Sequence, residues 1–371
     1  MARVWPLLLG LVACAASTGR PPAGDVTTEA PGGSKMSEID FGLQDDEYWT
    51  DPQRTAMAVA EQLWAKGAET LAVGAPGRVV LEHRETLPLV AYRGGSYREL
   101  WASSFEERAV VVAVDVDHNR VYLGPINTEE LEPPDPPLDP AEAPDGNTTD
   151  VGLVDLRAAM ELPWEPAHYL ISVLMRERSS NRVPVELLHI PGSFIDPEVE
   201  RLQAQQRGQV EPLAISPPPG RPFPSFDKLD GSPPIPKEVG IALQVERVVT
   251  LREGARCLLH GAFRLPVRAE EIVKNPDRLA GASSADPPSA VLRVTLVATR
   301  SESGGASLLT LDVPTWDPAN GPGAIVTGHF ALDLLAHRFL SGKKAQTHFI
   351  YAVAGAVISG PAWAALVKEG R

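Results

Sequence analysis

Cys14 is the first residue whose chemistry stands out, because the 371-residue chain contains only two cysteines and this one directly follows an apolar run. The run extends from Val4 to Ala13, with Arg3 before it and small residues after it. A short basic start, an apolar segment and small residues form the layout of a secretory signal, and the segment is too short to span a bilayer as a helix. We therefore expect the chain to be exported, with a thiol at the end of its export signal.

The residues Leu11-Val12-Ala13-Cys14 resemble the lipobox of bacterial lipoproteins. The resemblance implies that a signal peptide of residues 1–13 is removed and that Cys14, the new N-terminus, carries acyl chains such as palmitate. It also implies attachment to the bacterial cell envelope, and Ala15 after the cysteine favours the outer membrane. Two alternatives stay open: Ala13-Cys14-Ala15 fits ordinary signal cleavage, which would give a soluble secreted protein, and the apolar run fits a hydrophobic N-terminal strand.

Residues 14–45 are expected to form the lipidated start and a flexible tether. Residues 15–38 are small, polar and rich in Gly and Pro, so they bury too little surface to offset the entropy of ordering them. With Cys14 acylated, Cys257 has no partner for an intramolecular disulfide. The net charge of −14 argues against nucleic acid as a ligand. The expected partners are therefore the membrane, through the N-terminal lipid, and an unidentified envelope protein or polysaccharide.

Asp115, Asp117 and Asn119 lie in the stretch VDVDHNR and offer the oxygen ligands that Ca²⁺ prefers. The stretch lacks the glycine and the distal glutamate of an EF-hand loop. Asp and Asn are also the residue types that a hairpin turn needs for left-handed backbone. The pattern therefore predicts a hairpin turn, with a weak calcium site as the alternative.

The remaining Cys and His pairs do not predict a metal site. Cys257 and His260 are three residues apart, so on a strand their side chains point to opposite faces, and a buried core cysteine is the better interpretation. His329 and His337 would share a face of a regular strand but lie roughly 26 Å apart. The chain also contains neither a G-x-S-x-G elbow nor an H-E-x-x-H motif. We therefore assign no catalytic residue, no metal and no cofactor.

Three Pro-rich segments divide the chain, and the first of them is the tether. The second, Thr128–Asp150, contains eight acidic residues and no basic one. It is expected to be a disordered loop, or an arm for a basic partner. The third separates two domains. The expected boundaries are a helix plus first domain at 46–190, a linker with a short helix at 191–238, and a second domain at 239–371.

Two short helices are expected, and the rest of the ordered chain is typical of strands. Asp51 and Pro52 start one helix that ends at Gly67, and Asp196 and Pro197 start the other. The strand-like stretches are β-branched, alternate in polarity and are bounded by turn residues. They include GRVVLEHR, AVVVAVDV, NRVYLGPI, IALQVERVVTL, ARCLLHGAFRL and AVLRVTLVATR.

An internal repeat links the two expected domains. The stretch HYLISVLMRERSSNRVPVEL, which starts at His168, aligns with HFIYAVAGAVISGPAWAALV, which starts at His348. Each is preceded by a similar strand end, Val154-Asp155-Leu156 and Leu332-Asp333-Leu334. We expect two copies of a strand, a corner and a hairpin, so the predicted fold is mainly β with two sandwich domains.

The approach to the first copy, which contains Trp164 and Tyr169, resembles the tyrosine corner of immunoglobulin-like domains. The resemblance implies a buried Tyr169 whose hydroxyl bonds to backbone between Glu161 and Pro166. In the second copy Phe349 stands at the matching place and has no hydroxyl. The predicted sandwiches are therefore immunoglobulin-like, with Trp164 and Tyr169 as structural residues.

The uncharged stretch Phe349–Val367 must also be weighed as a membrane helix. Its β-branched alternation, its central Ser359-Gly360-Pro361 and its match to the first hairpin favour strands. Taken together, these features predict a lipid-anchored envelope protein that acts as a binding, adhesion or scaffolding module. The alternative is an exported hydrolase or an accessory subunit of an envelope enzyme.

Overall fold

The computed structural model of the protein describes two β-sandwiches, both within the compact unit that spans Phe41–Arg371. Cys14, the tether and the two expected helices lie outside the described residues, and so does most of the acidic segment. The described residues are 49, 70–96, 105–126, 146–190, 224–273, 288–301, 305–337, 339–340 and 345–368. Among them, no helix is long and apolar enough to cross a membrane.

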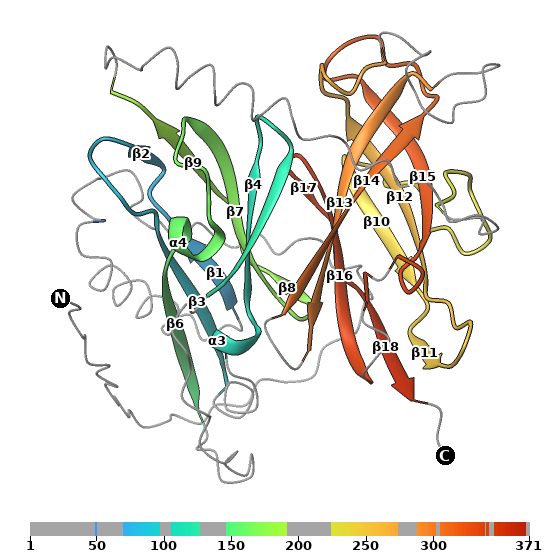
Figure 1. Ribbon diagram of the computed structural model, residues 1–371, viewed down its shortest axis with the longest axis horizontal. Coiled ribbons are helices and arrows are strands. Elements are labelled where there is room, and N and C mark those ends of the chain that lie inside the picture. The colour runs from blue at the N-terminus through green and yellow to red at the C-terminus, as the bar shows by residue number, and fades with distance from the viewer. Residues whose placement is uncertain are drawn as a thin grey trace, which may run out of the picture. The chain divides into compact units, whose positions relative to one another are not determined.

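The first sandwich is built from two facing sheets (Figure 1). One sheet has the order β1-β3-β6, and the other has the order β2-β9-β7-β4-β5, with β8 paired to β7. The strand β2 runs parallel to β9 at one edge. The strands are β1 (Thr70–Gly74), β2 (Arg78–Val80), β3 (Pro88–Ser96), β4 (Val110–Asp115), β5 (Arg120–Pro125), β6 (Asn147–Asp155), β7 (Ala167–Met175), β8 (Arg178–Ser179) and β9 (Val183–Leu188).

The second sandwich repeats this topology strand for strand. Its sheets have the orders β10-β12-β15 and β11-β18-β16-β13-β14, with β17 paired to β16, and β11 runs parallel to β18. The predicted mainly β fold with two immunoglobulin-like sandwiches is confirmed. The strands are β10 (Gly240–Val245), β11 (Val248–Leu251), β12 (Leu258–Pro266), β13 (Ala290–Arg300), β14 (Ala306–Thr315), β15 (Ile325–Asp333), β16 (Gln346–Ala354), β17 (Val357–Ile358) and β18 (Ala362–Lys368).

The repeated hairpins correspond in a register displaced by a single residue from the predicted alignment. The amide of Val173 donates to Ser180 Oγ at 2.8 Å, and the amide of Ala352 donates to Ser359 Oγ at 2.9 Å, so Val173 corresponds to Ala352. Because strand side chains alternate between faces, such a displacement moves each of them to the other side. The buried Tyr169 therefore corresponds to the buried His348, whereas His168 is exposed.

An aspartate at the end of β6 and of β15 closes the same corner in both sandwiches. Asp155 Oδ1 accepts from the amide of Leu87 at 3.0 Å, and Asp333 Oδ1 accepts from the amide of Cys257 at 3.3 Å. Asp155 is also the N-cap of α4 (Leu156–Met160), a helix that the sequence analysis did not predict. These bonds align β3 with β12, so that Leu87 corresponds to Cys257.

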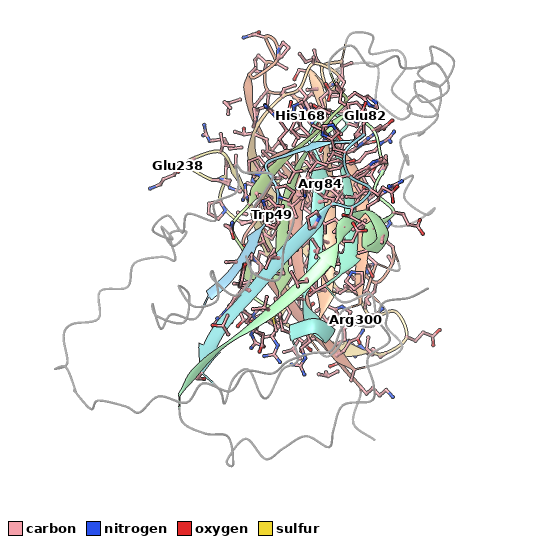
Figure 2. The ribbon with its side chains drawn as sticks, turned by 90° about the vertical axis from the view of Figure 1, so that its left-hand side faces the viewer. Trp49, Glu82, Arg84, His168, Glu238 and Arg300 are labelled. Carbon is pink, nitrogen blue, oxygen red and sulfur yellow. The ribbon has the colours of Figure 1, made fainter. Side chains whose placement is uncertain are left out.

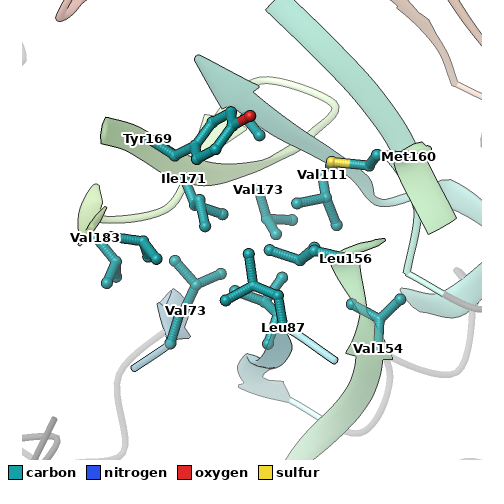
Figure 3. Packing of buried hydrophobic residues seen from close by; sticks show 14 of the residues in the cluster. Val73, Leu87, Val111, Val154, Leu156, Met160, Tyr169, Ile171, Val173 and Val183 are labelled. Atoms are coloured by element: carbon teal, nitrogen blue, oxygen red, sulfur yellow. The ribbon is translucent and has the colours of Figure 1, made fainter. Parts of the chain in front are cut away.

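The core of the first sandwich consists of aliphatic side chains from both sheets (Figure 3). Ile171 and Val173 of β7 face Val73 of β1, and Tyr169 lies at the edge of the cluster. Figure 3 also shows Leu156 of α4 in this core, so the unpredicted helix covers one end of the sandwich. A second helix, α3 (Phe105–Arg108), adds Phe105 to the same core.

The core of the second sandwich contains two reciprocal Gly–Phe pairs between β12 and β15. Gly261 is paired with Phe330, and Gly328 is paired with Phe263. A Cβ on Gly261 would lie 2.1 Å from the Phe330 ring, and one on Gly328 would lie 2.6 Å from the Phe263 ring. Each ring therefore occupies the place where the opposite residue would carry its side chain.

Several predicted boundaries need correction. Asn147–Asp150 belong to β6 and not to the acidic insertion at 128–150. In the predicted linker at 191–238, Ser225 forms a bridge to Ala331 of β15, so this part belongs to the second sandwich. The stretch IALQVERVVTL is two strands, β10 and β11, one in each sheet. The sequence could not separate them because their alternation continues across the break.

Candidate functional site at the junction of the sandwiches

The predicted calcium residues at the β4–β5 turn point to three different partners. Asp115 accepts from the amide of His118 at 3.0 Å and lies 2.8 Å from its Nδ1. Asp117 accepts from the amide of His168 at 2.9 Å. Asn119 has a φ of 51° and bonds to the second sandwich. The turn interpretation fits this backbone, and no group of three or more His, Cys, Asp or Glu in the described ranges could hold a metal ion.

His168, which Figure 2 labels, is exposed and lies beside two carboxylates. His168 Nδ1 lies 2.9 Å from Asp117, and its Nε2 lies 3.8 Å from Glu186. The hydrogen bond that the His168 ring donates to the Asp117 carboxylate is the main cause that raises the pKa of His168, with burial opposing it. Glu186 also accepts from Arg78 at 2.9 Å. These contacts cross-link neighbouring strands, and none of them presents an activated nucleophile.

Cys257 and His260 occupy separate environments, as their spacing predicts. Cys257 is fully buried, and burial, followed by the charges of Asp333 and Glu246, raises the pKa of its thiol to about 12. Such a thiol is a core residue and not a reactive one. His329 lies on β15, but His337 lies in the turn after that strand, so the predicted regular strand does not extend to it.

Trp164 and Tyr169 both contribute to the first core. Trp164 packs against the core cluster, and the Arg157 guanidinium carbon lies 4.7 Å from the centroid of its ring. The Tyr169 ring is buried and meets Tyr122 edge to face at 6.3 Å. Its hydroxyl is buried and has no hydrogen-bond partner among the described residues. The bond that a tyrosine corner requires to backbone between Glu161 and Pro166 is therefore not formed there.

His348 occupies the position of Tyr169 in the second sandwich and is held neutral. It is buried, and its Nε2 accepts from the Gln346 amide nitrogen at 2.9 Å. Burial, followed by the charge of Arg300, lowers its pKa to about 4. The predicted alignment of the two hairpins was displaced by a single residue, so it placed Phe349 at this position.

This histidine predicts a loss of stability in acid. An unfolded histidine titrates at about pH 6.5, so protonation favours the unfolded chain. The neutral His348 contributes about 3 kcal/mol to the free energy of unfolding. This contribution is fully present above about pH 6.5 and is lost as the pH falls to about 4. Between pH 7 and pH 4, the free energy of unfolding in urea should fall by about 3 kcal/mol less for His348→Tyr than for the wild type. The control is His83→Gln, which replaces an exposed histidine of the first sandwich, and identical pH dependence in wild type and His348→Tyr would contradict the assignment.

The two sandwiches meet through an apolar cluster on their larger sheets. This junction cluster consists of Val112, Val114, Leu174, Val297, Tyr351 and Val353. The alternate residues of the same strands belong to the two separate cores, for example Val111 and Leu296. The junction residues therefore point away from their own cores and toward the other sandwich.

The junction uses corresponding positions of the two repeats. In the register of the repeated hairpins Leu174 corresponds to Val353, and their partners on β4 and β13 make Val112 correspond to Val297. Each sandwich thus contributes the same face, as in the isologous contact of a symmetric dimer. All six side chains of the cluster are at most 1% exposed.

Polar bonds to backbone surround the junction cluster. The Tyr351 hydroxyl donates to the carbonyl of Arg176, and Arg182 donates to the carbonyl of Ala356. Arg268 donates to the carbonyls of Val116 and Asp117. These contacts join the turns of one sandwich to the turns of the other. The turn that contains the predicted calcium residues is therefore a contact between the sandwiches.

A cavity of about 310 Å³ lies beside these polar contacts. Its walls include Leu265, Leu292 and Val357, with Arg268 and Glu271 as the charged residues. Glu271 accepts from the amides of Arg268 at 2.9 Å and Arg293 at 3.2 Å, and burial is the main cause that raises its pKa. Both charged side chains already bond to protein atoms, so the cavity is suited to apolar contact and not to acid–base chemistry.

The junction was not predicted from the sequence, although the sequence contains one signal of it. The stretch AVVVAV at 109–114 is apolar without interruption, whereas a strand with one solvated face alternates. Every residue of β4 is buried. A continuous apolar run on a central strand therefore indicated that both of its faces were covered.

Comparisons with known proteins give no family for this chain. No family model and no curated protein matches it. Three of the similar solved structures show how low the scores are. The BSP domain of a biofilm-associated protein has 8% identity and a TM-score of 0.18, with 81% of this chain and 30% of that chain covered. The Torso receptor tyrosine kinase structure has 6% identity and a TM-score of 0.16, with 84% and 88% covered. An adhesin from Mobiluncus mulieris has 8% identity and a TM-score of 0.13, with 81% and 100% covered.

The chain thus spans less than a third of the biofilm-associated structure. TM-scores this low do not support an inference of function.

Proposed function

We propose that the protein is a lipid-anchored binding module of the bacterial cell envelope. In this proposal the acylated Cys14 attaches it to the outer membrane, and the surfaces of the two joined sandwiches recognise an envelope protein or polysaccharide. The lipobox resemblance of Leu11–Cys14 supports the anchor. Sandwiches that present loops and strand edges on a rigid frame support recognition.

The observation that carries the proposal is the junction cluster. Six buried side chains and a rim of backbone bonds hold the two sandwiches together, so their remaining surfaces keep a fixed relation. Such a preorganised surface loses less entropy on binding than two independently moving domains. The Arg and His side chains described above bond to backbone and carboxylates, which favours recognition over catalysis.

The anchor is tested with labelled fatty acid and membrane fractionation. We expect the wild type to take up the label and to stay with the membrane in high salt, because each buried CH₂ contributes about 0.8 kcal/mol. Cys14→Ala should take up no label and should either remain uncut or appear soluble. Its melting temperature should not change, since the described residues of the two cores begin at Leu71, far along the chain from Cys14.

The matched control is Cys257→Ala, which removes the buried thiol and should keep the label. The recognition step is tested by measuring binding of the purified chain to isolated envelope polysaccharide and, separately, to envelope proteins. A wild type that takes up no label and washes off with salt would contradict the anchor. A chain that binds neither envelope fraction would contradict the recognition role.

A further inference from the structure

One edge of the second sandwich has an apolar outer face. The edge strand is β11, which lies beside β18 in the larger sheet (Figure 1). Val248 of β11 is 56% exposed, and Trp363 and Val367 of β18 are 37% and 36% exposed. Val249 and Leu366 of the same strands belong to the core, so the three exposed side chains point away from it. We call Val248, Trp363 and Val367 the edge patch.

The corresponding edge of the first sandwich is charged. In the register of the repeated hairpins, Glu186 of β9 corresponds to Ala365 of β18. Their partners on the parallel edge strands are Arg78 and Val248, which therefore correspond as well. Arg78 donates to Glu186 at 2.9 Å, and charged side chains on an edge strand are a common protection against pairing with another chain. The fold therefore accepts charges at this edge, and only the second sandwich leaves it apolar.

The free side of β11 carries backbone donors and acceptors. The amide of Ala365 donates to the carbonyl of Arg247 at 2.8 Å, so this carbonyl points toward β18. Backbone groups of successive strand residues point to opposite sides, so the N–H and C=O groups of Val248 and Thr250 point away from β18. No second strand pairs with β11 in the part of the chain that the structure describes. These groups are therefore placed to pair with an added strand.

The edge patch continues the apolar surface of the junction cluster. Phe349 of β16 packs against that cluster and is paired with Trp363 on β18. The Arg247 guanidinium carbon lies 5.5 Å from the centroid of the Trp363 ring. Trp and Arg are among the residue types that contribute most of the binding energy in protein interfaces. A partner on the edge patch therefore extends the surface that already joins the two sandwiches.

An extended protein segment matches both the free backbone groups and the edge patch. Its main chain pairs with β11, and every second side chain then points to the outer face of the sheet. Val248 meets these side chains directly, and Trp363 and Val367 continue the apolar face on the next strand. A polysaccharide offers no main-chain N–H and C=O groups to the edge. The partner class is therefore a protein segment with apolar residues at alternate positions.

We propose that β11 binds an extended segment of another protein by strand addition, with the apolar side chains of that segment on the edge patch. This inference rests on the proposed recognition role and names the class of its partner. The envelope fractions test the recognition role, and a synthetic peptide tests the edge, so the two are tested separately.

The test measures binding of a fluorescein-labelled peptide, KTVTVTVK with blocked ends, to the purified full chain by fluorescence anisotropy. We expect saturable binding by the wild type and about ten-fold weaker binding by Thr250→Pro, which removes a free N–H but no bond to β18. Val248→Lys should weaken binding similarly, because it replaces the apolar contact with a charge. Both side chains are exposed, so the melting temperature should change little. The control is Leu308→Lys, which changes an exposed leucine on β14 at the opposite edge of the same sheet and should bind like the wild type.

A second peptide, KTTTVVVK, has the same composition without the alternation and should bind at least about ten-fold more weakly to the wild type. Equal binding of the two peptides, or undiminished binding by Thr250→Pro, overturns the proposal. A wild type that binds an envelope fraction but not KTVTVTVK overturns strand addition and leaves the recognition role standing. Sedimentation of the wild type as a dimer and of Thr250→Pro as a monomer also overturns it, because β11 then serves a second copy of the chain.

Discussion

Replacing Val297 with aspartate should separate the two sandwiches while each of them stays folded. Val297 is fully buried in the junction cluster, and placing an unpaired carboxylate there costs several kcal/mol. Each sandwich has a hydrophobic core of its own, so breaking the junction is the least costly response. We expect a larger radius of gyration in solution scattering and two unfolding transitions in place of one.

Leu308→Asp is the matched control for this experiment. Leu308 is paired with Val297 on the neighbouring strand but is 42% exposed, so a carboxylate there stays solvated. It should leave the radius of gyration and the single transition unchanged. If Val297→Asp behaves in the same way, the two sandwiches do not depend on the junction cluster.

Gly261→Ala should destabilise the second sandwich by about 3 kcal/mol. The new methyl carbon would lie 2.1 Å from the buried Phe330 ring, which must then move in a packed core. Gly328→Ala should show the same effect through Phe263, at about 2 kcal/mol, because its closest approach is 2.6 Å. The measurement is the free energy of unfolding in urea, read from the single transition of the joined sandwiches.

Two further variants separate this clash from a general effect of losing a glycine. Gly360→Ala has nothing within 4 Å of the added atom, so its stability should change little. Combining Gly261→Ala with Phe330→Leu should cost less than the sum of the two single changes, because the smaller side chain makes room for the methyl group. Strict additivity would show that the ring and the glycine do not interact.

The strands were predictable because their signal is local. AVLRVTLVATR alternates, is rich in β-branched residues, and forms β13 with the predicted bounds Ala290–Arg300. The hairpin repeat was predictable for the same reason, and strands at Gln346–Ala354 and Ala362–Lys368 exclude the helical alternative. The exact register of the repeat was not predictable, because His168 and His348 look alike in sequence while they face opposite sides.

The contacts that decide the candidate sites could not be predicted from the sequence, because they join residues that are distant along the chain. The residue types of Asp115, Asp117 and Asn119 suited calcium. Each side chain instead bonds to a residue at least three positions away, and two of these three partners lie on other strands. The buried Tyr169 was predicted from its approach sequence, whereas its missing hydroxyl bond depends on the loop geometry.

The parallel pairing of β2 with β9 and of β11 with β18 has a mechanical consequence. In each sandwich an early strand lies beside the last strand and runs in the same direction, so tension between the two ends pulls these strands past each other lengthwise. Their hydrogen bonds are then loaded together and must break at once, whereas a hairpin pulled open at its end breaks one bond after another. Three residue pairs in the first sandwich and four in the second bear this load, so under tension the first sandwich should yield before the second.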